Sequence, residues 1–221
     1  MGEHQKNAVR LAGMELERSC HACAFFHDRD EEYRVLLPFA QEGFERGEKG
    51  FHIVDPRHRQ ERLRRLEQLG IDLREAERTG RIEVRAWENA HLRQGHFDQY
   101  AMLALVEEVL TGGKAGGFGT TRFWANMEWA LEDYPGVYDL VEYETRLNYI
   151  LPKYDDVVVC TYDLTRFGAG VVIDILRTHP MMIIGEIVQP NPFFVSPDEF
   201  LRELHRRVEQ PAPHGSQPVR A

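Results

Sequence analysis

Residues 22–26 are ACAFF, residues 51–54 are FHIV and residues 81–84 are RIEV, three short segments of which the first two are rich in apolar side chains. A strand covered on both faces of a sheet is apolar along its length, whereas a strand with one wet face alternates strictly. Segments with helical spacing of apolar residues separate the three runs. This part of the chain therefore predicts parallel strands joined by helices.

The rest of the chain continues the same alternation. The expected strands cover residues 22–26, 51–54, 81–84, 121–126, 157–162 and 181–184. The expected helices cover residues 31–46, 56–69, 97–110, 137–151 and 170–177, with a last one starting at 196. The prediction is an α/β fold of three layers, with a mostly parallel central sheet between two layers of helices.

We expect one domain, because no linker or internal repeat divides the chain. Residues 1–19 are polar and predict an N-terminal arm, either loose or a short helix. Residues 20–209 form the expected domain. Residues 210–221 are rich in Pro, Gly and Ser and predict a disordered tail.

The composition narrows the functional class. The 221 residues carry a net charge of −9, which argues against a protein that binds nucleic acid directly through its phosphates. Three cysteines and a polar N-terminus without a secretory leader predict a reduced, cytoplasmic protein. We expect no membrane association, since no apolar run approaches the ~20 residues that span a bilayer.

Several short motifs follow in order within the first 84 residues. They are EG at 42–43, RGE at 46–48, GFHIV at 50–54, LEQLGIDL at 66–73 and TGRIEV at 79–84. This series resembles the opening of the RecA/KaiC ATPase family. In that family the first strand leads into a phosphate loop, and the resemblance implies a RecA/KaiC-like fold.

The phosphate loop itself is missing. Residues 27–32 are HDRDEE, without glycine or lysine and with four carboxylates that would repel a triphosphate. A phosphate loop needs glycines for close backbone approach, a lysine for the phosphates and a Ser or Thr for Mg²⁺. The Walker A motif is therefore degenerate, and we expect no nucleotide cofactor.

Downstream motifs point to a narrower group. They are RFWANMEWAL at 122–131, EYETRLN at 142–148, CTYD at 160–163 and NPFF at 191–194. With the degenerate loop, they resemble the MEDS (methanogen/methylotroph, DcmR-like) sensory domain over about residues 20 to 205. The resemblance implies a non-catalytic sensory domain that detects a small organic molecule and acts in signal transduction.

Ligands of open parallel sheets bind beyond the carboxyl ends of the strands. Polar and aromatic side chains follow the expected strands at these positions and would suit a small organic ligand. The candidate ligand-binding residues are His27, Asp28, Asp55, Trp87, Asn126, Glu128, Trp129, Tyr162 and Asp163.

Some of these residues have other interpretations. Glu128 could bind ligand, or it could be a structural carboxylate paired with Arg122 or Arg146. Glu128 and Asp163 could act with His27 as acid and base in an enzyme, although the sequence has no nucleophile motif. The acidic residues at 28–32 could simply stabilise the first turn of a helix through its dipole.

A metal or haem-type sensor is a further alternative. Cys20, His21, Cys23 and His27 carry suitable ligand atoms within eight residues. Their spacing along one strand and past its end places them poorly for one site. The competing interpretation is that Cys23 and Cys160 are buried structural residues, so no metal ligand is assigned.

Two surface features and the output route complete the expectations. The glycine-rich segment 112–119 predicts a flexible lead-in or lid, and the arginines between 57 and 65 predict a solvated helix face or a docking patch. About 20 residues precede the first strand, too few for a helix-turn-helix. We therefore expect output through a signalling or regulatory protein partner, and a homodimer stays open.

Overall fold

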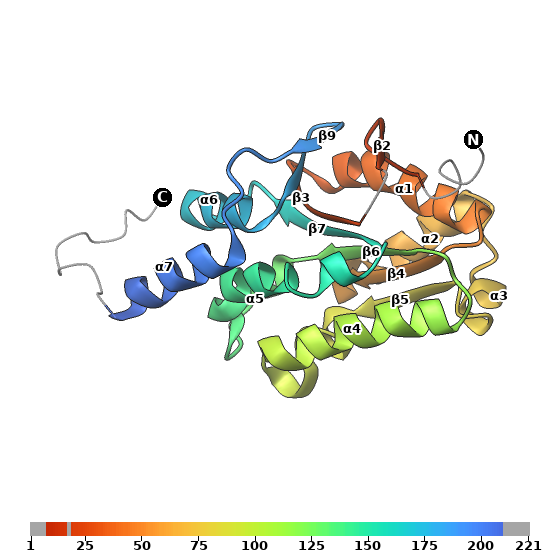
Figure 1. Cartoon of the computed structure of the whole chain (residues 1–221). Coiled ribbons are helices and arrows are strands. Elements are labelled where there is room, and N and C mark those ends of the chain that lie inside the picture. Colours follow the sequence, from red (N-terminus) through yellow and green to blue (C-terminus); the bar gives the residue numbers. More distant parts are fainter. Residues whose placement is uncertain (1–7, 17–18, 210–221) are drawn as a thin grey trace.

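The computed structural model describes residues 8–16 and 19–209. Its centre is a seven-stranded sheet in the order β5-β4-β6-β7-β3-β8-β9, with every neighbouring pair parallel except β8 and β9 (Figure 1). The strands are β3 (Cys20–Phe26), β4 (Lys49–Val54), β5 (Ile82–Ala86), β6 (Thr121–Asn126), β7 (Val157–Asp163), β8 (Met181–Ile184) and β9 (Ile187–Pro190). The predicted, mostly parallel α/β sheet is confirmed.

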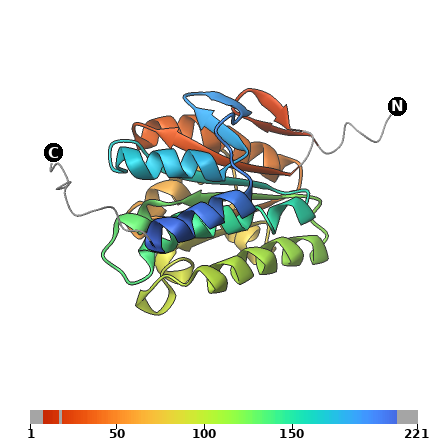
Figure 2. The same cartoon turned by 60° about the vertical axis from the view of Figure 1, so that its left-hand side comes forward.

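Helices cover both faces of this sheet. They are α1 (Arg29–Glu45), α2 (Arg59–Gln68), α3 (Leu73–Arg78), α4 (Gln99–Ala115), α5 (Leu140–Leu147), α6 (Ala169–Thr178) and α7 (Pro197–Glu209). One hydrophobic core joins α1, α2 and α3 to one face, and a second core joins α4, α5 and α6 to the other. Helix α7 packs against α5 and α6 (Figure 2), and its Phe200 is buried.

Side chains of each strand alternate between the two cores. In β3, His21, Cys23 and Phe25 face the layer of α4, α5 and α6, whereas Cys20 and Ala22 face the layer of α1, α2 and α3. Because successive side chains of a strand point to opposite faces, neighbouring residues of one motif serve different sites.

The turn from β3 to α1 lies at the position where the sequence resemblance would place a phosphate loop. Only His27 and Asp28 separate the two elements. Asp28 caps α1 by accepting a hydrogen bond from the Glu31 backbone N–H at 2.8 Å, and Glu31 Oε2 accepts from the His27 N–H at 2.8 Å. These carboxylates occupy backbone donors that a phosphate would otherwise need.

The N-terminal segment differs from the predicted loose arm or short helix. Residues 8–16 contain the antiparallel hairpin of β1 (Val9–Leu11) and β2 (Met14–Leu16), which turns at Ala12 and Gly13 with φ of 45° and 76°. Val9 and Leu11 are buried against the core that includes α1. The polar composition of residues 1–19 gave no signal for these two side chains, which become buried only by packing against α1. The predicted tail at 210–221 lies outside the described residues.

Three further expectations need correction. Gly112 and Gly113 belong to α4 rather than to a lid, and Gly113 permits close packing, because Thr121 Oγ1 lies 2.6 Å from the place of its Cβ. The helix expected at 137–151 is shorter, since single 3₁₀ turns flank α5. Arg62 on the arginine-rich helix is buried rather than solvated.

Candidate functional site

The carboxyl edge of the sheet encloses a small polar cavity of about 10 Å³, room for about one water molecule. It is lined by Phe26, Asp28, Arg29, Glu32, Asn126, Glu128, Thr161, Tyr162 and Asp163. Five of the predicted ligand-binding residues therefore meet here, from the ends of β3, β6 and β7. We call this group of nine residues the rim cavity.

Glu128 is one of the two buried carboxylates of the rim cavity, the other being Glu32. Its Oε1 accepts from Asn126 Nδ2 at 3.1 Å, and the Asn126 side chain in turn accepts from the Glu128 N–H at 3.3 Å. Arg166 forms a close ion pair with Glu128, and Arg29 approaches it at 3.9 Å. Two guanidinium groups thus neutralise one carboxylate at the sheet edge.

The ion-pair partners expected for Glu128 were wrong. Arg122 pairs instead with Glu48 at 2.5 Å and Glu42 at 2.9 Å, at the opposite end of β6. Arg146 pairs with Glu142 of its own helix at 2.6 Å. The structural role foreseen for Glu128 exists, but its partners come from α1 and from the turn after β7.

Asp55 and Trp87 lie further along the same edge and do not line the rim cavity. Arg57 donates to both carboxylate oxygens of Asp55 at 2.7–3.0 Å and lies over the Trp87 ring at 5.6 Å. Burial alone would raise the pKa of Asp55, but the hydrogen bonds from Arg57 hold it below the usual value. Asp55 is therefore an ionised, fully engaged helix cap.

Trp129 and His27 are also outside the rim cavity. Trp129 is fully buried in the core, where its ring contacts His91 at 4.7 Å and Phe97 at 4.2 Å between centroids. The His27 side chain is 74% exposed and lies 3.5 Å from Glu31. The structure brings neither residue to the predicted pocket.

Four lining residues escaped the sequence analysis: Phe26, Arg29, Glu32 and Thr161. Glu32 accepts hydrogen bonds from Arg62 at 3.1 Å, Trp124 Nε1 at 2.8 Å and Thr161 at 3.2 Å. One signal could have revealed it, because Glu32 lies one helical turn before the buried Leu36. No local signal distinguishes Arg29 from the other arginines of the chain.

The residues suggested for a metal or haem-type site do not converge. Cys20 faces the opposite side of the sheet from His21 and Cys23, and His27 is exposed. Only His21 of the four belongs to a group of close ligand atoms, together with Glu144, Cys160 and His179. All four side chains of this group, the histidine cluster, are buried.

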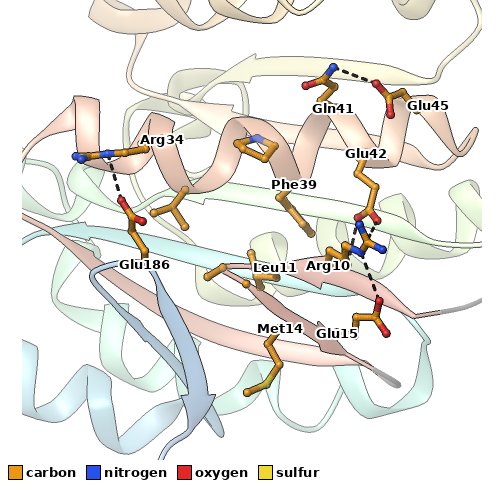
Figure 3. Close-up of a pocket in the computed structure, with 14 residues that line it drawn as sticks. Arg10, Leu11, Met14, Glu15, Arg34, Phe39, Gln41, Glu42, Glu45 and Glu186 are labelled. Carbon is orange, nitrogen blue, oxygen red and sulfur yellow. Dashed lines mark hydrogen bonds and ion pairs between the residues drawn. The ribbon is translucent and has the colours of Figure 1, made fainter.

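An open groove of about 760 Å³ lies between the hairpin and α1 (Figure 3). Ion pairs line it: Arg10 pairs with Glu15 within the hairpin at 3.4 Å, and Arg34 of α1 pairs with Glu186 of the β8–β9 turn at 3.5 Å. Its walls come mainly from the hairpin and the flank of α1, with Glu186 added from the β8–β9 turn. The groove is therefore unrelated to the ligand position usual for parallel sheets.

The fold defines a class before any relative is considered: a three-layer α/β domain with a mostly parallel sheet, whose first sheet strand, β3, leads into a helix capped by carboxylates. Among the described residues, no helix combines the length and apolar character needed to cross a membrane.

Comparison with known proteins narrows the class. Residues 20–180 match the family described as MEDS, the MEthanogen/methylotroph, DcmR Sensory domain, and the chain belongs to this family. The family gives the chain a sensory or regulatory role. The transcriptional repressor DcmR of Methylorubrum extorquens is 24% identical over 177 residues, which cover 79% of this chain and 64% of the repressor. The chain thus spans less than two thirds of that relative.

A solved structure supports the fold. The KaiC-like protein of Pyrococcus horikoshii OT3 superposes with a TM-score of 0.51 and 16% sequence identity, over 75% of this chain and 69% of that one. At this identity the likeness concerns the fold alone, and it confirms the predicted KaiC-like architecture.

Proposed function

We propose that the chain is a non-catalytic sensory domain that binds a small organic ligand at the rim cavity. The observation that carries the proposal is the convergence of Asp28, Asn126, Glu128 and Asp163 at the carboxyl edge of a parallel sheet. This edge is where such sheets bind ligands. The alternative of an enzyme that uses His27 with Glu128 and Asp163 has no histidine at the site, because the His27 side chain points into solvent rather than toward Glu128.

The ligand must displace an arginine to enter. The cavity holds only about one water molecule while Arg166 and Arg29 occupy Glu128. Arg166 is the movable group, since its side chain is 35% exposed and sits on the turn after β7. Ligand entry therefore changes the conformation of this turn, which is what a sensor requires.

The lining predicts the ligand's chemistry. Four of the lining side chains are carboxylates (Asp28, Glu32, Glu128 and Asp163), and two of these, Glu32 and Glu128, are buried. A small molecule that donates hydrogen bonds or carries a positive charge would make the same kind of contact with these carboxylates as the guanidinium of Arg166 does. We therefore propose small amines as the first ligand class, with alcohols second.

The test is a thermal-unfolding screen of the full chain against small amines, alcohols, carboxylates and ATP with Mg²⁺. A ligand at 100 times its Kd adds about 2.7 kcal/mol to the free energy of unfolding. Stabilisation by an amine that is lost in Glu128→Gln and retained in Glu132→Gln, outside the cavity, supports the proposal. Stabilisation by ATP with Mg²⁺, or an amine response that survives Glu128→Gln, contradicts it.

We also propose that output passes to a regulatory protein partner, with a second copy of this chain as the simplest case. Support comes from the edge of the sheet, where β9 exposes Ile187 and β8 exposes Ile184. An open edge strand pairs readily with another chain. Sedimentation velocity of the wild type and of Ile187→Lys tests the dimer: a dimer that the lysine dissociates supports it, and a monomer at all concentrations contradicts it.

A further inference from the structure

We infer that the histidine cluster is a binding site for one divalent first-row transition ion, held by His21 Nε2, Glu144 Oε2, Cys160 Sγ and His179 Nε2. This site is separate from the rim cavity and does not depend on the proposed ligand. The four residues come from β3, α5, β7 and the turn between α6 and β8. Their ligand atoms all lie within 4.8 Å of one another.

Four of the six distances between the donors lie near the edges of a coordination tetrahedron. Glu144 Oε2 lies 3.2 Å from His21 Nε2, 3.3 Å from His179 Nε2 and 3.6 Å from Cys160 Sγ. Cys160 Sγ lies 3.9 Å from His21 Nε2. Bond lengths of about 2.0–2.3 Å to zinc give tetrahedral edges of about 3.3–3.6 Å, so the donors, all within 4.8 Å of one another, would draw together around the ion.

Hydrogen bonds outside the cluster orient both imidazoles. The Asn148 side-chain amide donates to the carbonyls of Glu144, Thr145 and Thr178, the last at 2.7 Å. Its oxygen must therefore face His21 Nδ1 at 3.1 Å and accept a hydrogen bond from the Nδ1–H group. His179 Nδ1 lies 3.0 Å from the Ile175 carbonyl, which also can only accept.

In their neutral forms, with Nδ1 protonated, the two rings would present the lone pairs of both Nε2 atoms to the cluster. An Nδ1–H bonded to a carbonyl or amide oxygen is the usual support of a metal-bound histidine. His179 Nε2 is buried and lacks hydrogen-bond geometry to any described group, although a carboxylate oxygen is nearby. Such lone pairs would be repelled by the negatively charged Glu144 oxygen unless a cation lies between them.

The charge balance supports the same conclusion. Glu144 is fully buried, and its ion-pair partners among the described residues are His21 and His179, with no arginine or lysine. A buried carboxylate with no arginine or lysine beside it needs a compensating positive charge, and a divalent ion held by the same side chains supplies it.

The second oxygen of Glu144 is already occupied. Tyr162 donates its hydroxyl to Oε1 at 2.8 Å, which leaves Oε2 free for the ion. Four protein ligands with no open position are typical of structural rather than catalytic zinc sites, and two nitrogens, one oxygen and one sulfur suit Zn²⁺ or Co²⁺. The ion would tie α5 and the α6–β8 turn to the centre of the sheet.

Cobalt tests the site directly, because sulfur bound to Co²⁺ gives a charge-transfer band in the near ultraviolet. The full chain is unfolded with a chelator, refolded with Co²⁺, and its bound metal and absorption are measured. We expect one Co²⁺ per chain, the sulfur band and strong visible bands of tetrahedral cobalt. Cys160→Ser should remove the sulfur band, and the matched Cys20→Ser, on the other face of β3, should keep it.

Asn148→Ala provides a second variant that leaves all four ligands in place. Loss of its hydrogen bond to His21 should weaken Co²⁺ binding about 10–100-fold. Folding of each variant is checked by circular dichroism. The proposal is overturned if the refolded wild type binds no stoichiometric Co²⁺, if the sulfur band persists in Cys160→Ser, or if Cys23→Ser removes it instead.

Discussion

Glu32 and Glu144 are both buried glutamates that approach β7, one from each face of the sheet, but their surroundings differ. Glu32, on α1, faces the guanidinium of Arg62, the indole of Trp124 and the hydroxyl of Thr161. Glu144, on α5, faces two imidazoles, a thiol and the phenol of Tyr162. The first carboxylate has a permanent cation, whereas the second has only groups whose charge depends on protons or on a metal.

This difference shows that the two faces of β7 support two different sites. Thr161 points to Glu32, and its neighbours Cys160 and Tyr162 point to Glu144. On one face of β7, Arg62 and Glu32 form a neutralised ion pair at the rim cavity. The histidine side gathers soft donors around one oxygen, as a transition-metal site does.

Removing the permanent cation should have the largest effect. Arg62→Met leaves Glu32 buried without its guanidinium, and we expect a loss of about 3–5 kcal/mol in the free energy of unfolding by urea. Arg64→Met is the matched control on the same helix, since Arg64 is 53% exposed, and it should change stability by less than about 1 kcal/mol. Equal effects of the two variants would refute the assigned role of Arg62.

A buried histidine beside Arg62 should make stability depend on pH. Burial and the charge of Arg62 lower the pKa of His52 to about 3. The unfolded chain takes up this proton below about pH 6.5 and the folded chain does not, so stability falls as pH falls between these values. We expect His52→Phe to flatten the dependence of the unfolding free energy by about 1.4 kcal/mol per pH unit between pH 6 and 4. An unchanged slope would show that His52 is protonated in the folded chain.

The arginine at the mouth of the rim cavity should contribute less than Arg62. Arg166→Met removes one of two cations near Glu128, and because Arg166 is partly exposed we expect a cost of about 1 kcal/mol. The same substitution opens the cavity, so amine binding should tighten while stability falls. Calorimetric titration and urea unfolding measure the two effects, and weaker amine binding would contradict the displacement mechanism.

The smallest effect is expected at His27. Its side chain is 74% exposed and lies 3.5 Å from Glu31, so His27→Ala should change the free energy of unfolding by less than about 0.5 kcal/mol. Metal and amine binding should also remain unchanged in calorimetric titrations. A large loss of either would restore His27 to the site.

Much of the fold followed from local patterns. The strands at 121–126 and 181–184 have the predicted bounds, because their apolar runs are set off by glycine, proline and charged residues. The β1–β2 hairpin and the antiparallel β9 were missed. Val9 and Leu11 bury against α1, and β9 depends on its pairing with β8, so no local pattern specifies either element.

The rim cavity could be anticipated in part, since carboxyl ends of neighbouring parallel strands must meet. Its arginines could not, because Arg166 lies 38 residues from Glu128 and many arginines compete for each carboxylate. The histidine cluster was hidden for a related reason. His21 and Cys160 become neighbours only once β3 and β7 are paired, and Glu144 and His179 arrive from a helix and a turn.

The most direct test of the contrast between the two glutamates is the response of stability to Zn²⁺. Urea unfolding of the full chain would be measured with a chelator and after refolding in Zn²⁺. At 100 times the Kd, Zn²⁺ should add about 2.7 kcal/mol to the wild type and to Glu32→Gln, and nothing to Glu144→Gln. An unresponsive wild type, or an equal response in Glu144→Gln, would contradict the account.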